Sequence, residues 1–161
     1  MKTNRCKSLC VLPLLVLCFI LNSCGKDVYF SDVAVFDNDE WSSKDIATFT
    51  INIDDITRAY DVNFLVRNSG QYSFANVWFF LTTVEPDNKI VTEKFNCKLA
   101  REDGKWLGSH SAGYFDNTIP YKTAHKFEKP GTYTISIEQG MRINPLPAIN
   151  GVGIQICLSE Q

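Results

Sequence analysis

Apolar and polar residues alternate along several short stretches of this chain. In the clearest one, residues 47–54, every second position is apolar and the positions between them are Thr, Asn or Asp. This period of two is typical of a β-strand with one buried and one solvated face. Residues 60–67, 132–138 and 152–158 repeat the pattern. Residues 77–81 are apolar at every position, which predicts a central strand covered on both faces.

Turn signals separate these stretches. The run Pro86-Asp87-Asn88-Lys89 predicts a hairpin between residues 77–81 and residues 90–99. Asp103-Gly104 follows, and this dipeptide is the one best suited to a type I′ turn. The Ser/Gly-rich residues 109–113 indicate a flexible loop.

The fold class follows from the number and spacing of these elements. Further strands are expected at residues 28–36, as an edge strand, and more weakly at residues 119–127. About eight short strands and no stretch at helical period predict an all-β domain, an antiparallel two-sheet β-sandwich. Strand count alone leaves an immunoglobulin-like and a jelly-roll-like topology open, and we favour the first slightly.

The N-terminus has a different pattern. Lys2, Arg5 and Lys7 make a basic start, and residues 11–21 are almost entirely apolar, which is the layout of a secretory signal peptide. An apolar run of about eleven residues is too short for a helix that crosses the bilayer, which takes ~20. We therefore predict that this segment is a signal and not an anchor.

The signal ends in Leu21-Asn22-Ser23-Cys24, which resembles the lipobox of bacterial lipoproteins. The resemblance implies cleavage before Cys24 and attachment of acyl chains, palmitate among them, to its thiol. The expected organisation is a signal peptide at residues 1–23 and a single β-sandwich domain at residues 24–161, held to the membrane by lipid on Cys24. The alternative is ordinary signal-peptidase cleavage near Ser23, which would leave Cys24 a plain thiol.

Charge and cysteine content narrow the class further. The chain has a formal net charge of −2, and the basic leader makes the mature part more acidic. Because its basic residues are scattered, we expect no nucleic-acid partner. Cys97 and Cys157 remain after the leader and the lipid site, either as a disulfide or as two buried or partly buried thiols. They fall on opposite phases of their strands, apolar for Cys97 and polar for Cys157, which disfavours the disulfide.

Candidate chemistry is sparse. His110 and His125 have no second His or Cys at ligand spacing, and Ser109 and Ser111 beside His110 are neighbours in sequence only. The acidic runs at 37–40 and 54–55 lack the spacing of an EF-hand and are interpreted as solvated turns. We expect no catalytic residues, no metal site and no cofactor.

Aromatic residues are more informative. Exposed aromatic side chains on a sandwich stack on sugar rings or contact partner proteins. Trp78 lies in the doubly apolar strand and is assigned to the core, whereas Tyr72 and Trp106 lie beside turns and fit either role. An alternative function is therefore carbohydrate binding, with Trp106, Tyr72 and Tyr114 as a stacking platform.

Four blocks of sequence occur together in one order: 67–68, 72–78, 99–100 with 103–108, and 139–142. Together they resemble the gliding-motility lipoprotein GldH family, over nearly the whole mature chain. The resemblance implies a lipoprotein of the cell envelope that is needed for gliding in motile species and has no known enzymatic activity or cofactor. In relatives that do not glide it would imply a wider role in envelope assembly or secretion.

These observations predict a non-enzymatic protein that is anchored by lipid in the cell envelope. Within the envelope, we expect it in the outer membrane. It would act through contacts with envelope or gliding-machinery proteins. The candidate contact residues are Tyr72, Trp106, Arg67 and Arg142. Arg67 lies on the polar phase of its strand, where it can pair with a carboxylate or a partner, and the fork of Arg142 can grip carboxylates in two places. The sequence leaves open whether the domain faces the periplasm or the cell surface.

Overall fold

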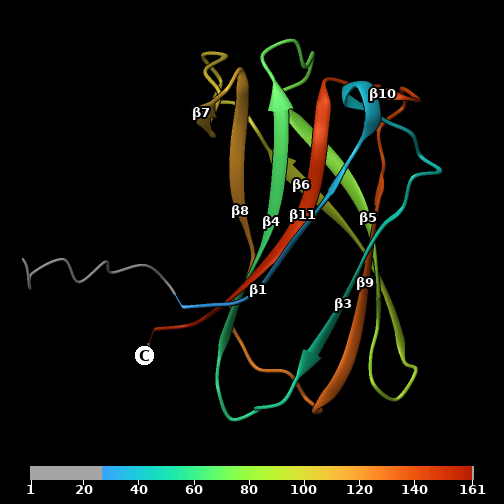
Figure 1. The fold of residues 1–161 in the computed structure, drawn as a ribbon, viewed down its shortest axis with the longest axis vertical. Helices are drawn as coiled ribbons and strands as arrows, with labels where there is room; N and C mark the ends of the chain where they lie inside the picture. Colours follow the sequence, from blue (N-terminus) through green and yellow to red (C-terminus); the bar gives the residue numbers. More distant parts are fainter. Residues whose placement is uncertain (1–26, 161) are drawn as a thin grey trace, which may run out of the picture.

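The computed structural model describes residues 27–160 as an all-β body (Figure 1). The predicted leader, residues 1–23, and the predicted lipid site at Cys24 lie outside the described residues. Within residues 27–160 the helical structure is limited to one 3₁₀ turn, η2 (Asp37–Asp39), and no helix there has the length and apolarity needed to cross a bilayer.

One sheet contains five antiparallel strands in the order β1, β11, β4, β8, β7. Their bounds are Val28–Val35 (β1), Ile149–Leu158 (β11), Tyr60–Ser69 (β4), Tyr114–His125 (β8) and Ser109–Ser111 (β7). The predicted edge strand is confirmed, because β1 pairs with β11 alone. Val28 pairs with Cys157, so the first described residues lie beside the C-terminal end of the chain (Figure 1).

The second sheet contains four antiparallel strands in the order β3, β9, β5, β6. Their bounds are Ala47–Ile53 (β3), Gly131–Gln139 (β9), Asn76–Val84 (β5) and Ile90–Lys98 (β6). The predicted hairpin is confirmed, since β5 and β6 pair from Asn76 opposite Lys98 to Val84 opposite Ile90. A short ladder of β2 (Glu40–Trp41) with β10 (Leu146–Pro147) is hydrogen-bonded to neither sheet.

The strand pairs nest inside one another along the chain. With the short β2, β7 and β10 set aside, the pairs are β1 with β11, β3 with β9, β4 with β8, and β5 with β6 in the middle. A long hairpin of four strands against four, wrapped into two sheets, is the jelly roll. The two-sheet sandwich is confirmed, and the preference for an immunoglobulin-like topology is wrong. Alternation along a strand reveals its faces but not its neighbours in the sheet.

The hydrophobic core lies between the two sheets. Strand β3 buries its four apolar residues and exposes the three polar residues between them, as its alternation predicts. Near the centre, the Phe64 and Phe79 rings meet edge to face with centroids 5.6 Å apart, and Trp41 meets Phe79 in the same way at 5.6 Å. All three side chains are fully buried.

Strand β5 is central in its sheet, as predicted, but it is covered on one face only. Val77, Phe79 and Leu81 are buried, whereas Trp78 is 43% exposed and Phe80 is 38% exposed on the outer face. The assignment of Trp78 to the core is therefore wrong. A strand that is apolar on both sides does not reveal whether a layer covers its second face, and among the described residues no third layer does.

The segment after Gly104 also differs from the prediction. Residues 109–111 form β7 instead of a loop, and β8 begins at Tyr114 instead of Ile119. The type I′ turn lies at Ala112-Gly113, where both residues have positive φ. At the earlier turn, by contrast, only Gly104 has positive φ, and its amide donates to the Arg101 carbonyl. This geometry is a type I turn followed by a left-handed glycine.

The two cysteines of the body are separate buried thiols. Cys97 on β6 and Cys157 on β11 belong to different sheets and are not joined by a disulfide. Burial raises the pKa of the Cys97 thiol, which lies on the apolar phase as predicted. Cys157, expected on the polar phase, is also buried, in a strand flanked by β1 and β4 on its two sides.

Candidate functional site

Arg67, a predicted contact residue, lies on β4 opposite Asp116 of β8. Its Nε is 3.6 Å from Oδ1 of Asp116, and its guanidinium carbon is 4.7 Å from the ring centroid of Tyr114. The two side chains of the ion pair are 37% and 45% exposed, so solvent screening leaves the pair little effect on stability. Arg67 thus pairs with a carboxylate, one of the two roles expected for it, and its side chain remains partly exposed although Nε itself is buried.

Tyr114 connects this ion pair to the other edge of the sheet. Its hydroxyl donates to Oδ2 of Asp39 at 2.9 Å, and Nδ2 of Asn150 donates to Oδ1 of the same carboxylate at 2.8 Å. The hydrogen bond to Asp39 is the main reason that the pKa of Tyr114 is raised. A neutral Tyr114 therefore holds the end of β8 against η2 and the start of β11.

Tyr72 and Trp106 meet at the same end of the sandwich. The hydroxyl of Tyr72 donates to the carbonyl of Asn76 at 3.0 Å, and its ring is only 4% exposed. Trp106 is half-buried, with its ring centroid 6.4 Å from that of Tyr72 and 5.6 Å from that of Phe115. Because Tyr72 is a core residue, it has almost no surface for a partner, and the set Trp106, Tyr72 and Tyr114 does not form an exposed stacking platform.

Arg142 lies apart from this group. It is exposed in the connection between β9 and β10, and no contact among the described residues joins it to Arg67, Tyr72 or Trp106. Of the four predicted contact residues, Arg67 is partly exposed and ion-paired, Trp106 is half-buried and Tyr72 is buried. Arg142 is exposed and has no partner in the described part of the chain. They do not form one continuous site.

The histidines do not assemble a catalytic set. His110 lies on β7 between Ser109 and Ser111, whose side chains project to the opposite face of the strand, and its ring packs 5.1 Å from that of Phe115. His125 ends β8, far along the chain from these hydroxyl groups. Within residues 27–160 no three His, Cys, Asp or Glu side chains gather as metal ligands would.

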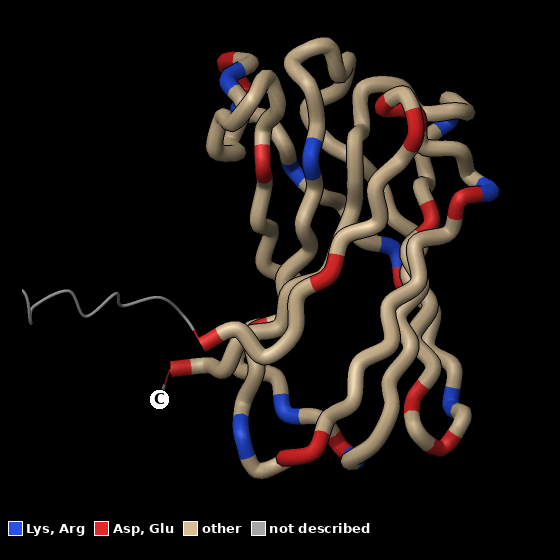
Figure 2. The backbone as a smooth tube through the Cα atoms, viewed as in Figure 1, with Lys and Arg blue, Asp and Glu red and all other residues tan. Residues whose placement is uncertain are grey.

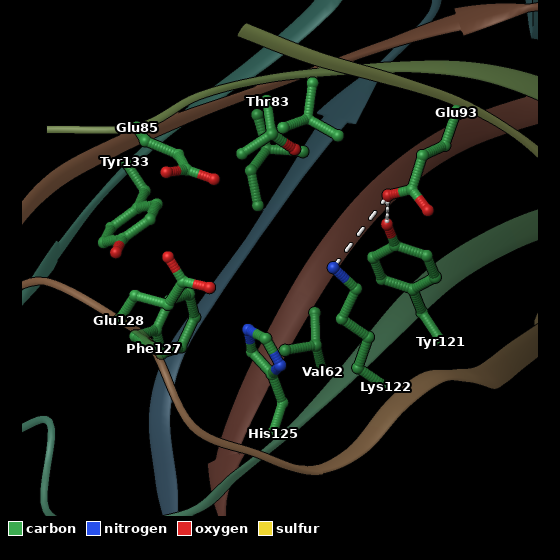
Figure 3. Close-up of a pocket in the computed structure, with 12 residues that line it drawn as sticks. Val62, Thr83, Glu85, Glu93, Tyr121, Lys122, His125, Phe127, Glu128 and Tyr133 are labelled. Carbon is green, nitrogen blue, oxygen red and sulfur yellow. Dashed lines mark hydrogen bonds and ion pairs between the residues drawn. The ribbon is translucent and has the colours of Figure 1, made fainter. Parts of the chain in front are cut away.

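A cavity of about 240 Å³ lies between the two sheets, where β8 and the chain after it face β5, β6 and β9. Apolar and polar groups both line it: Val62, Thr83, Glu85, Val91, Glu93, Tyr121, Lys122, His125, Phe127, Glu128, Tyr133 and Ile135. Figure 3 shows the carboxylates of Glu85 and Glu128 directed into the space near the His125 ring. The cavity thus presents carboxylates and one imidazole over apolar walls.

Glu93 holds the two sheets together on the other side of this cavity (Figure 3). Tyr121 of β8 donates its hydroxyl proton to the carboxylate of Glu93 on β6, and Nζ of Lys122 lies 3.9 Å from the same group. Burial, followed by this hydrogen bond, raises the pKa of Tyr121. Burial and the nearby Lys122 charge lower the pKa of His125, against the opposing effect of Glu128. The imidazole is therefore neutral at pH 7 and can accept a hydrogen bond.

Sequence reasoning missed this cavity and the outward position of Trp78. The cavity residues come from five strands and two connections, and only the sheet order brings Glu93 of β6 opposite Tyr121 of β8. No spacing along the chain signals such a pair. For Trp78, the unbroken run of apolar residues in β5 predicts burial on both faces, whereas one face is exposed.

Comparison with known proteins identifies the family. A family model described as "GldH lipoprotein" matches residues 28–156, from the start of β1 almost to the end of β11. The chain belongs to the GldH lipoprotein family. The resemblance inferred from the four sequence blocks is confirmed.

Two relatives of the GldH family show how the likeness is spread. "Gliding motility lipoprotein GldH homolog" of Christiangramia forsetii is 26% identical over 148 residues, which cover 88% of this chain and 90% of that protein. "Gliding motility lipoprotein GldH" of Flavobacterium johnsoniae is 24% identical over 150 residues, which cover 89% of this chain and 92% of the relative. Both likenesses therefore extend over nearly the full length of each protein.

The GldH match also locates the predicted residues relative to the family. All four candidate contact residues fall within the matched range, and so do the strands of the two sheets, apart from the last two residues of β11. Cys24 precedes the matched range. The family match thus covers the folded body, and the assignment of a lipid to Cys24 depends on the lipobox-like residues alone.

Proposed function

We propose that this chain is a non-enzymatic lipoprotein of the cell envelope, held in the outer membrane by lipid on Cys24. It acts by contacting proteins of the gliding machinery or, in a host that does not glide, of envelope assembly or secretion. The observation that carries the proposal is the GldH lipoprotein match over residues 28–156. The names of both relatives, which describe gliding-motility lipoproteins, support it.

The geometry of the body agrees with a role in binding. Arg67 presents a partly exposed side chain beside Tyr114, and Arg and Tyr are residue types that often dominate protein interfaces. On β7 the hydroxyl groups of Ser109 and Ser111 project to the face opposite the His110 ring, so these groups do not pair as nucleophile and base. These features support a role in binding.

The lipid assignment is tested on the N-terminus of the protein isolated from its own membranes. Mass spectrometry should find a mature chain that begins at Cys24 and carries acyl chains, and Cys24→Ala should release the protein from the membrane fraction. An unmodified N-terminus on a freely soluble product would contradict the proposal. Proteinase treatment of intact cells then decides which side of the membrane the body faces.

The contact role is tested by recovering partners with full-length chain from envelope extracts. Arg67→Ala should reduce recovery of specific envelope proteins, and Arg67→Lys should restore it only in part, because lysine lacks the planar fork of arginine. Arg58→Ala is the matched control, since Arg58 is also exposed and ion-paired, 3.3 Å from Asp55 in the connection between β3 and β4. Equal recovery with all three variants would remove Arg67 from the interface, and turnover of an ester, peptide or glycan would contradict the non-enzymatic role.

A further inference from the structure

Two aromatic rings stand side by side on the outer face of the four-stranded sheet. Trp78 and Phe80 are two residues apart on β5, so they point to the same face, and both are more than a third exposed. A hollow of about 300 Å³ beside them is lined by Trp78, Phe79, Phe80, Lys94 and Gly140. We call these five residues the Trp78 surface.

Gly140 keeps this hollow open. Its amide donates to the carbonyl of Trp78 at 2.7 Å, which brings the two backbones close together. A Cβ at Gly140 would lie 3.1 Å from a ring carbon of Phe80 and 3.3 Å from the Trp78 carbonyl oxygen. Only a residue without a side chain therefore fits here without displacing the Phe80 ring.

The exposed rings are not explained by the core. Trp78 and Phe80 face away from the inter-sheet space that Phe79 fills. Adjacent exposed aromatic side chains on a soluble body mark interaction sites more often than chance, and Trp is among the residues most enriched at energetically dominant interface positions. The Trp78 surface therefore has the composition of a binding site.

The charges around the surface indicate the sign of its partner. Nζ of Lys94 lies 5.4 Å from the ring centroid of Phe80, and Lys98 occupies the same outward phase of β6. Arg142 directly follows Met141, whose sulfur lies 3.4 Å from the backbone nitrogen of Trp78. Among the described residues no carboxylate forms an ion pair with Lys94, Lys98 or Arg142. Glu138 of β9, however, is directly opposite Phe80 in the sheet.

These cations contrast with the chain as a whole, which has a formal net charge of −2. Figure 2 shows acidic positions in the turns at both ends of the sandwich. We propose that the Trp78 surface docks an acidic segment of a partner protein, with an apolar side chain of that segment in the hollow and its carboxylates on Lys94 and Arg142. This inference rests on the proposed contact function and names the face that performs it.

A protein segment fits this surface better than the other occupants. The rings alone would also suit a sugar, but the cations beside them, Lys94, Lys98 and Arg142, favour a charged partner over a neutral sugar. A second copy of the chain carries the same net negative charge, which opposes self-association. An acidic peptide with an apolar anchor matches both the rings and the unpaired cations.

The test places a photo-crosslinking amino acid at Asn96, the β6 residue opposite Trp78, in the full-length protein in its own cells. A second probe at Thr118, an exposed residue of β8 in the other sheet, reports contacts made elsewhere. We expect the Asn96 probe to label a partner segment rich in Asp and Glu. Trp78→Ala and Lys94→Glu should each lower the yield about tenfold, as loss of a dominant interface residue does. Val35→Ala, at a 69% exposed position on β1, is the control and should not change it.

The outcomes separate this inference from the proposed function. Labelling of a glycan, of a second copy or of a basic segment at Asn96 would overturn the docking assignment, as would a yield that survives both variants. If the Thr118 probe labels envelope proteins and the Asn96 probe labels none, the contact function stands and the Trp78 surface is excluded. If neither probe labels a protein, the docking assignment fails, and the contact function is then decided by the recovery of partners with the Arg67 variants. Lys94→Glu leaves the aromatic rings in place, so its effect does not depend on how Trp78→Ala folds.

Discussion

Phe79 and Phe80 are neighbours on one strand, and the structure predicts that they differ sharply in their contribution to the free energy of unfolding. Phe79 is fully buried and meets the rings of Trp41 and Phe64, while Phe80 is 38% exposed on the opposite face. Replacing either by Ala removes the same atoms from the same strand. The pair therefore tests whether β5 is covered on one face or on two.

The magnitudes follow from burial. Phe79→Ala leaves a cavity among packed rings, and such substitutions cost about 3–5 kcal/mol. Phe80→Ala opens no cavity and removes a ring that is only partly covered, so a fraction of the transfer free energy of about 1.5–3 kcal/mol is lost, about 1 kcal/mol. The expected difference is about 2–4 kcal/mol, a large part of the 5–15 kcal/mol stability of an ordinary domain.

Equilibrium unfolding in urea, followed by circular dichroism, measures both variants against the parent. With a slope of about 1.5 kcal/mol per molar urea, a loss of 3 kcal/mol moves the midpoint by about 2 M, whereas Phe80→Ala should move it by less than about 1 M. Equal shifts would refute the one-faced arrangement. They would mean that a layer covers the outer face, and the Trp78 surface would then have no exposed rings to offer.

Three further outcomes are expected. Gly153→Ala should destabilise the fold by about 1–3 kcal/mol in the same urea assay and speed amide exchange in β1, because the Cβ of the new alanine would lie 2.3 Å from a backbone carbonyl oxygen of β1. Gly70→Ala is the control and should be close to neutral, because the heavy atom nearest to its Cβ would be 3.7 Å away. Burial and Lys122 hold the pKa of His125 below its ordinary 6.5, so as the pH falls His125 is protonated in the unfolded chain before it is protonated in the folded one. The free energy of unfolding should therefore decrease between about pH 7 and about pH 5, and it should decrease less in the His125→Gln variant. Cys97, whose thiol pKa burial raises, should resist alkylation in the native protein and react on unfolding, as peptide mass spectrometry would show.

Local patterns in the sequence predicted local structure well. The alternation at residues 47–54 matches the burial of β3 position by position, and the turn at 86–89 joins β5 to β6 as predicted. These features depend on residues close together in the chain. The strand β7 was missed because its turn places Ala112 at positive φ, a conformation that sequence signals assign to Gly, Asn or Asp.

Features that depend on the order of strands could not be predicted in this way. The jelly-roll nesting, the Glu93 and Tyr121 contact between sheets and the cavity beside it all require knowing which strands face each other. Burial of Tyr72 depends likewise on how the connection between β4 and β5 folds back over the core. The sequence therefore indicates contact residues by residue type alone, and the structure separates them by exposure.

The edge position of β1 determines how the body responds to force. Any pull on the chain ahead of Asp27 enters the body through β1, whose side chains are mostly exposed and which is held chiefly by its backbone pairing with β11. Two amides secure its ends, from Leu158 to the carbonyl of Asp27 at 2.8 Å and from Phe36 to the carbonyl of Asn150 at 2.8 Å. If the proposed lipid on Cys24 tethers the protein, we therefore expect tension to separate β1 from β11 first, before it disturbs the strands that enclose the core.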